Sequence, residues 1–132
     1  MSDNYSLIIK NGFCYINGKL VKVDLGLSRK KIKKIGKIEL DSSKVFDATN
    51  KVILPGIIDT QVHFREPGST DAEDLESGSR AAVLGGVTSL FEMPNTNPPT
   101  SNLVEFEKKL QLAKDRMHSN YAFYFGATPE NT

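Results

Sequence analysis

The chain has 132 residues, of which 39% are hydrophobic and 25% charged, a composition typical of globular proteins. Its 17 Lys and Arg residues nearly balance its 16 Asp and Glu residues, and the net charge of +1 argues against a dedicated nucleic-acid binder. No run approaches the roughly 20 apolar residues of a membrane span, and residues 1–5 lack the pattern of a signal peptide. The lone cysteine, Cys14, excludes an internal disulfide and a Cys-rich zinc site. We therefore expect a cytoplasmic protein with no nucleic-acid or membrane partner.

Residues 1–54 have the pattern of a small β-sandwich or open barrel. Apolar stretches at 5–9, 13–16, 20–27 and 44–47 are separated by turn residues, and Asn17-Gly18 is a strong signal for a two-residue hairpin. The basic run at 29–34 is predicted to be a solvated turn between strands rather than a nucleic-acid patch. We expect Cys14 to be a buried strand residue, because no histidine or basic cluster lies near it in the sequence.

The pattern changes at residue 55, where strands begin to alternate with helices. We predict strands at 57–64, 87–93 and 121–126, a helix that begins with a capping box at 70–73 and ends at Gly85-Gly86, and a second helix at 101–119. This βαβαβ order predicts an α/β fold with a parallel sheet. His118 falls near the end of the second helix and is expected at the surface.

The end of the first of these strands carries a row of polar residues. In parallel sheets, functional groups gather at the carboxyl ends of the strands. A strand period of two places Asp59, Gln61, His63 and Arg65 on one face. Four polar groups on one strand face are costly unless something binds them, and a metal at His63 with an anion at Arg65 would satisfy both. The alternative for His63 is a hydrogen-bonded histidine of the core.

The second strand leads into another polar segment. It delivers Glu92 and then Asn95 and Asn97 in a proline-rich loop. An Asn amide can donate to a carboxylate or accept from an N–H group, which suits a polar substrate. Asn-Thr-Asn-Pro also favours a turn on its own account, so both interpretations of Asn95 and Asn97 remain open.

Three blocks of the sequence resemble the cyclic amidohydrolases, and most closely the dihydroorotases. They are Leu-Pro-Gly-Ile-Ile-Asp (54–59) with Gln-Val-His-Phe-Arg-Glu-Pro-Gly (61–68), Ala-Ala-Val-Leu-Gly-Gly-Val-Thr (81–88), and Met-Pro-Asn-Thr-Asn-Pro (93–98). The blocks occur in the family's order, and residues 1–54 match the small β-domain that flanks the family's barrel. The resemblance therefore covers essentially the whole chain.

The resemblance implies a distorted (β/α)₈ barrel with one or two zinc ions at the strand ends. Residues 55–132 would form its first βαβαβ portion. In the family, a metal-activated hydroxide attacks the ring amide of dihydroorotate and gives carbamoyl aspartate, in pyrimidine biosynthesis. Carried over to this chain, His63 is implied to be a metal ligand, and Arg65 and Asn95 are implied to bind the substrate carboxylate. The resemblance also implies a homodimer or an association with aspartate transcarbamoylase.

The chain departs from the family pattern in two respects. Gln61 stands where the family has the first histidine of His-x-His, and a neutral amide oxygen is a poorer zinc ligand than imidazole. A single-metal site or a non-catalytic scaffold is therefore an alternative, as is a hydantoinase, dihydropyrimidinase or allantoinase activity. The second departure is length, because such a barrel takes about 250 residues. The remaining ligands and the general base are expected beyond residue 132, and the chain alone is expected to be inactive.

Overall fold

The computed structural model describes residues 4–39 and 44–132. These residues form two compact units, which divide between Pro55 and Gly56. Within the described part of the chain, no helix is long and apolar enough to cross a membrane.

The N-terminal unit contains two small sheets. One has the strand order β5-β4-β1-β6 and the other β3-β2-β7. The hairpin predicted at Asn17-Gly18 is confirmed, because Ile16 pairs with Lys19 and both turn residues have positive φ, 49° and 80°. The strands are β1 (Leu7–Lys10), β2 (Phe13–Ile16), β3 (Lys19–Lys22), β4 (Leu25–Ser28), β5 (Lys31–Ile35), β6 (Val45–Asp47) and β7 (Val52–Ile53).

The predicted turn at 29–34 is shorter than expected. Only Arg29 and Lys30 make the turn, with φ of 50° and 60°, while Lys31–Ile35 is strand β5 at the edge of its sheet. Alternating lysines suit an edge strand, because their charge discourages pairing with a further strand. The prediction for Cys14 is confirmed, since this β2 residue is 3% exposed.

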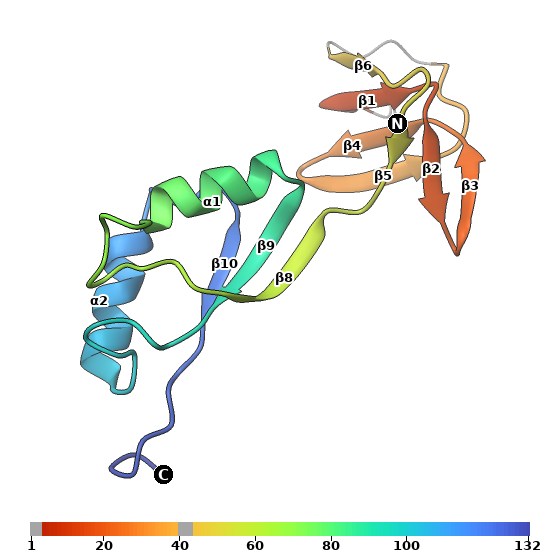
Figure 1. Ribbon diagram of the computed structural model, residues 1–132. Coiled ribbons are helices and arrows are strands. Elements are labelled where there is room, and N and C mark those ends of the chain that lie inside the picture. Colours follow the sequence, from red (N-terminus) through yellow and green to blue (C-terminus); the bar gives the residue numbers. More distant parts are fainter. Residues whose placement is uncertain (1–3, 40–43) are drawn as a thin grey trace. The chain divides into compact units, whose positions relative to one another are not determined.

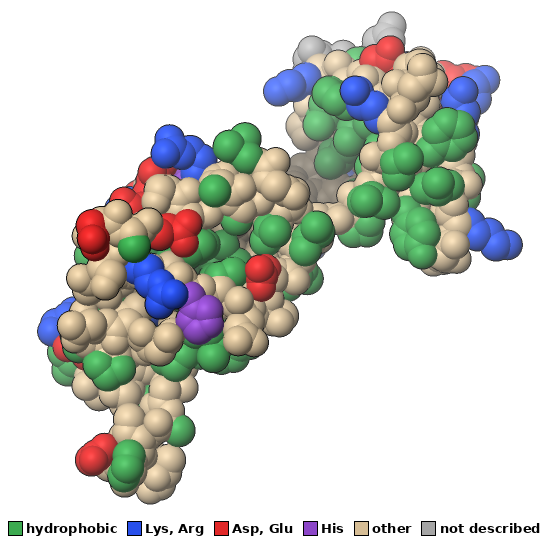
Figure 2. Space-filling model, viewed as in Figure 1, with side chains coloured by type: hydrophobic (Ala, Val, Ile, Leu, Met, Phe, Trp, Pro, Cys, Tyr) green, Lys and Arg blue, Asp and Glu red, His purple; other side chains and the backbone are tan. Residues whose placement is uncertain are grey.

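The core of the N-terminal unit is small. Its buried cluster consists of Tyr5, Ile8 and Ile38. Larger hydrophobic side chains remain exposed, among them Tyr15 and Leu20, and Figure 2 shows hydrophobic side chains gathered over β2 and β3. Much of the hydrophobic surface of this unit therefore lies outside its core.

The C-terminal unit is a three-stranded parallel sheet with two helices (Figure 1). Its elements are β8 (Ile57–Val62), α1 (Leu75–Leu84), β9 (Val87–Glu92), α2 (Leu103–Ala113) and β10 (Asn120–Phe123), with β9 in the centre of the sheet. Both helices contribute to one core cluster, in which Leu75 and Ala113 meet Leu90 of β9 and Phe64. The predicted α/β fold with a parallel sheet is thus confirmed.

The helix boundaries differ from the prediction because tertiary contacts select them. Helix α1 is capped by Asp74 in a capping box with Ser77, and the capping box predicted at 70–73 is wrong. Helix α2 is capped by Asn102 and ends at Ala113, six residues before the predicted end. Asp115 has a φ of 60°, which a helix cannot accommodate.

Helix α1 lies unusually close to the segment after β8. A Cβ atom built on Gly78 would come within 2.5 Å of the Phe64 ring. Only glycine therefore fits at this point of the helix. The contact holds α1 directly against the residue between His63 and Arg65.

Candidate functional site

His63 and Asn95 meet at the ends of neighbouring strands. His63 directly follows β8, Asn95 lies in the loop after β9, and the His63 Nδ1 and Asn95 Oδ1 atoms are 2.8 Å apart. Since an amide oxygen can only accept, this hydrogen bond requires a proton on Nδ1, and in the neutral imidazole the lone pair is then on Nε2. The same bond leaves the Asn95 NH₂ group as the end of the amide that can reach a ligand.

The two loops that carry these residues are tied to each other. The Met93 N–H donates to the Val62 carbonyl at 2.9 Å, and the Asn97 N–H donates to the Pro67 carbonyl at 3.1 Å. Gly68 adopts a φ of 119°, and a Cβ atom there would lie 2.9 Å from the Asn97 carbonyl oxygen. The described interaction of Asn97 is thus with the neighbouring loop, whereas the Asn95 side chain binds His63.

The other residues predicted on this strand are only partly where alternation puts them. Strand β8 ends at Val62, so His63 and Arg65 lie in the following loop, and the sheet register shifts between Asp59 and Val62. Asp59 Oδ1 accepts from the backbone N–H of Gln61 at 3.0 Å. The prediction of one continuous strand face from 59 to 65 is therefore wrong. In the described part of the chain, Arg65 is exposed and its side chain makes no hydrogen bond or ion pair.

Glu66, next to Arg65, is built into the scaffold instead. Arg116 donates to both carboxylate oxygens of Glu66, at 2.7 and 3.0 Å, and the Leu75 N–H at the start of α1 donates to Glu66 Oε2 at 2.9 Å. The hydrogen bonds from Arg116 to Glu66 raise the pKa of Arg116. The loop after β8 is thereby fixed to α1 and to the segment that follows α2.

Glu92 does not join the polar group at the strand ends, contrary to the prediction. Its side chain is fully buried and Oε2 lies 2.8 Å from Lys109 Nζ of α2. Burial raises the pKa of Glu92 to about 7, although the nearby Lys109 opposes the shift. Glu92 is the last residue of β9 and shares its face with buried Leu90, so its side chain belongs to the core beneath α2.

Sequence reasoning overlooked Lys109 and Arg116. Lys109 lies three residues after Phe106 and four before Ala113, on the apolar face of the predicted helix, and that position is a signal of a buried lysine. The pairing of Arg116 with Glu66 spans fifty residues and leaves no local signal. His118 is exposed, as predicted, but lies after the end of α2, where its Nε2 is 2.8 Å from Glu76 Oε1.

The donor set for a metal within this chain is small. The described residues contain no group of three or more His, Cys, Asp or Glu side chains that could hold a metal ion. His63 offers one imidazole nitrogen in a suitable tautomer, and its Nδ1 partner resembles the outer-shell hydrogen bond of metal-bound histidines. His63 therefore fits the role of one ligand of a metal ion.

The chain is similar to curated dihydroorotases and to a solved hydantoinase. A family model described as the Amidohydrolase family matches residues 52–130. The dihydroorotase of Lactobacillus gasseri is 41% identical over 122 residues, which cover 92% of this chain and 28% of that protein. The dihydroorotase of Thermococcus kodakarensis is 36% identical over 118 residues, or 89% of this chain and 29% of that protein. The chain thus spans less than a third of these relatives.

A solved structure shares the fold. The L-hydantoinase (dihydropyrimidinase) from Arthrobacter aurescens superposes with a TM-score of 0.87 and 29% sequence identity, covering 96% of this chain and 29% of that one. The predicted fold class is confirmed by this similarity, and the resemblance to dihydroorotases is confirmed by the curated relatives.

Proposed function

We propose that this chain, which belongs to the amidohydrolase family, is the N-terminal part of a dihydroorotase. The reaction would be the reversible hydrolysis of the cyclic amide of dihydroorotate to carbamoyl aspartate, a step of pyrimidine biosynthesis. Residues 1–54 would be a small β-sandwich domain, and residues 55–132 the first βαβαβ portion of a TIM-like barrel. A homodimer and an association with aspartate transcarbamoylase stay predictions from the resemblance, and a cytoplasmic location stays a prediction from the composition and the sequence of residues 1–5.

The observation that carries the proposal is the meeting of His63 and Asn95 at the carboxyl ends of β8 and β9. In this arrangement His63 Nε2 would hold zinc, which when bound would polarise the amide carbonyl and activate water. The Asn95 NH₂ group can donate to a carboxylate, and the exposed Arg65 guanidinium can do so with two parallel hydrogen bonds. These are the groups that a substrate with a free carboxylate requires.

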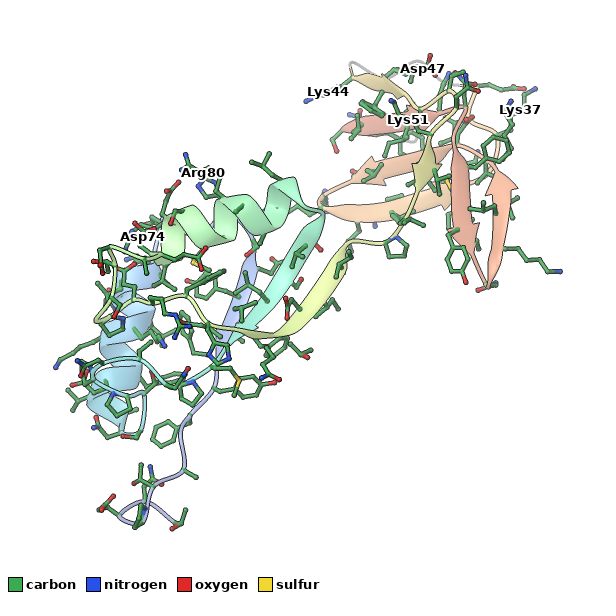
Figure 3. The ribbon with its side chains drawn as sticks, in the orientation of Figure 1. Lys37, Lys44, Asp47, Lys51, Asp74 and Arg80 are labelled. Atoms are coloured by element: carbon green, nitrogen blue, oxygen red, sulfur yellow. The ribbon has the colours of Figure 1, made fainter. Side chains whose placement is uncertain are left out.

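The test uses the protein expressed from its complete coding sequence and loaded with zinc. We expect it to open dihydroorotate and to close carbamoyl aspartate. Arg65→Ala should raise the KM for dihydroorotate about a hundredfold, because a charge-assisted contact to the carboxylate is lost. Arg80→Ala is the matched control, since Arg80 lies on α1 and points away from the sheet (Figure 3). An unchanged KM in Arg65→Ala would contradict the assigned role of Arg65.

A hydantoinase activity is the second candidate, and the structural similarity to the L-hydantoinase supports it. Its substrates include ring amides without a carboxylate, for which Arg65 and Asn95 would have no partner. Turnover of hydantoin or dihydrouracil, without turnover of dihydroorotate, would replace the first proposal with this one.

A non-catalytic scaffold is the alternative that Gln61 supports, because the amide replaces an imidazole at a ligand position. Metal analysis separates this alternative from the enzymes. A folded complete protein that binds no zinc and turns over none of these substrates would be the scaffold. An active protein with one zinc ion per chain would indicate a single-metal site, as the replacement of histidine by Gln61 suggests.

A further inference from the structure

Lys109 is an unusual residue because its whole side chain is buried. It is 1% exposed, and its partner Glu92 is fully buried. Ion pairs in the interior contribute little net stability compared with apolar residues of the same volume, because both charges lose their hydration. Such a pair is better explained by a geometry that it imposes.

The Lys109 ammonium reaches the beginning, the middle and the end of one loop. Nζ lies 2.8 Å from Glu92 Oε2, at the residue that ends β9. It donates to Thr96 Oγ1 at 3.4 Å, next to Asn95, and to Thr100 Oγ1 at 3.2 Å, where the loop approaches α2. The ammonium thus makes an ion pair with Glu92 and hydrogen bonds with two hydroxyls. The face of Phe123 lies 5.3 Å away and helps enclose the charge.

We propose that Lys109 is a positioning residue that fixes the loop 93–100 and thereby holds the Asn95 amide on His63. Without the ammonium, Thr96 and Thr100 lose their donor and the loop is free to rotate Asn95 away. His63 then loses the acceptor that keeps its proton on Nδ1. The catalytic meaning of this device rests on the proposed roles of His63 and Asn95, whereas the device itself is a matter of loop geometry.

The test compares Lys109→Met with Lys108→Met in the complete protein, stripped of metal. Lys108 is the neighbouring lysine, is mostly exposed, and among the described residues pairs with Glu105 alone. The ¹⁵N chemical shifts of the His63 ring, assigned with a His63→Gln variant, report which nitrogen carries the proton. We expect the Nδ1–H tautomer in the natural protein and in Lys108→Met, and a shift towards the Nε2–H tautomer in Lys109→Met. A role in stability alone would lower the melting temperature and leave these shifts unchanged, which would overturn the proposal.

Two further variants keep the test valid if Lys109→Met does not fold. Glu92→Gln with Lys109→Met removes both buried charges, so no unpaired carboxylate remains, yet the loop still lacks its donor. Thr96→Val keeps the ion pair and removes the Lys109 contact beside Asn95, together with the hydrogen bonds of Thr96 Oγ1 to the Pro98 carbonyl and to Thr100 Oγ1. Both should move the His63 shifts in the same direction as Lys109→Met. Unchanged shifts in both folded variants would contradict the proposal.

Activity separates this inference from the proposed function. If the protein is a dihydroorotase, Lys109→Met should raise the KM for dihydroorotate about tenfold, because the hydrogen bond from Asn95 to the carboxylate weakens. Changed His63 shifts in a protein that does not turn over dihydroorotate would uphold the positioning role and reject the proposed function. Full activity of Lys109→Met with unchanged His63 shifts would reject the positioning role alone.

Discussion

Two buried carboxylates hold the two loops at the strand ends, and they do so in different surroundings. Glu66 receives two hydrogen bonds from Arg116 and a third from the Leu75 N–H, and the Arg116 side chain is 36% exposed. Glu92 has Lys109 beside it and no solvent contact, and within the described structure neither of its carboxylate oxygens has a hydrogen-bond donor. The number of hydrogen-bond donors, rather than the presence of a cation, therefore decides how well a buried carboxylate is stabilised.

The largest effect on stability is expected when the pair of Glu66 and Arg116 is broken. Arg116→Met leaves Glu66 buried with only the Leu75 N–H, and should lower the free energy of unfolding by about 4 kcal/mol. Thermal or urea unfolding of the complete protein measures this. Arg80→Met is the control, because Arg80 has only a long, exposed contact of 3.7 Å with Glu76. Equal effects of both substitutions would mean that the Glu66 carboxylate does not depend on Arg116.

The pair of Glu92 and Lys109, in which the carboxylate has few donors, should make the stability of the protein depend on pH. The pKa of Glu92 is about 7 in the folded protein and near 4.5 when unfolded, so the folded state binds more protons between these values. Stability should therefore fall as pH rises through this window, by at most about 3 kcal/mol for this group. Glu92→Gln does not titrate and should lack this part of the decline. Parallel pH curves for the natural protein and the variant would show that Lys109 compensates fully for burial.

A smaller effect tests the contact that joins the loops without any charge. Gly68→Ala forces a Cβ atom against the Asn97 backbone and into a positive-φ conformation, which should cost about 2 kcal/mol. Gly86→Ala is the matched control, because Gly86 also has a positive φ, 93°, but open space around it. We expect about 1 kcal/mol there, from backbone strain alone. Unfolding curves that do not distinguish the two variants would argue against a close contact between the loops.

The smallest effect is expected for an ion pair whose lysine is mostly exposed. Lys108 and Glu105 are 2.7 Å apart on α2, and 63% of the Lys108 side chain is exposed. Lys108→Met should change the free energy of unfolding by no more than about 0.5 kcal/mol, and less in high salt. A loss comparable with that of Arg116→Met would break the contrast between buried and exposed pairs.

The sequence predicts the elements of this chain better than their ends. Alternating and helical hydrophobic patterns locate the strands and helices because burial of one face dominates their stability. The start of α1 depends on Glu66, nine residues away, which takes the Leu75 N–H, and no local pattern contains that choice. Residues 70–73 have the sequence of a capping box. In the structure, however, the Ala72 and Glu73 N–H groups donate to the Ser69 carbonyl.

The site shows the same division. His63 and Asn95 are recognisable from the motifs, and their position after parallel strands predicts that they lie close together. Their direct hydrogen bond depends on the side-chain geometry of two loops and is visible only in three dimensions. The prediction that Glu92 joins the polar groups at the strand ends is wrong, because a carboxylate at a strand end also occurs in a buried ion pair. Its burial under Lys109 follows from the face that it shares with Leu90.

Gly78 has a consequence for the order in which the chain folds. A glycine within a ten-residue helix costs about 1 kcal/mol, and helices this short are marginal in water by themselves. Helix α1 therefore gains its stability only once Phe64 is in place beneath Gly78. Helix α2 carries no glycine, and its residues 107–113, Glu-Lys-Lys-Leu-Gln-Leu-Ala, are good helix formers. Helix α2 can therefore form earlier. We expect α1, although it comes first in the chain, to form after α2, on the segment that carries His63 and Phe64.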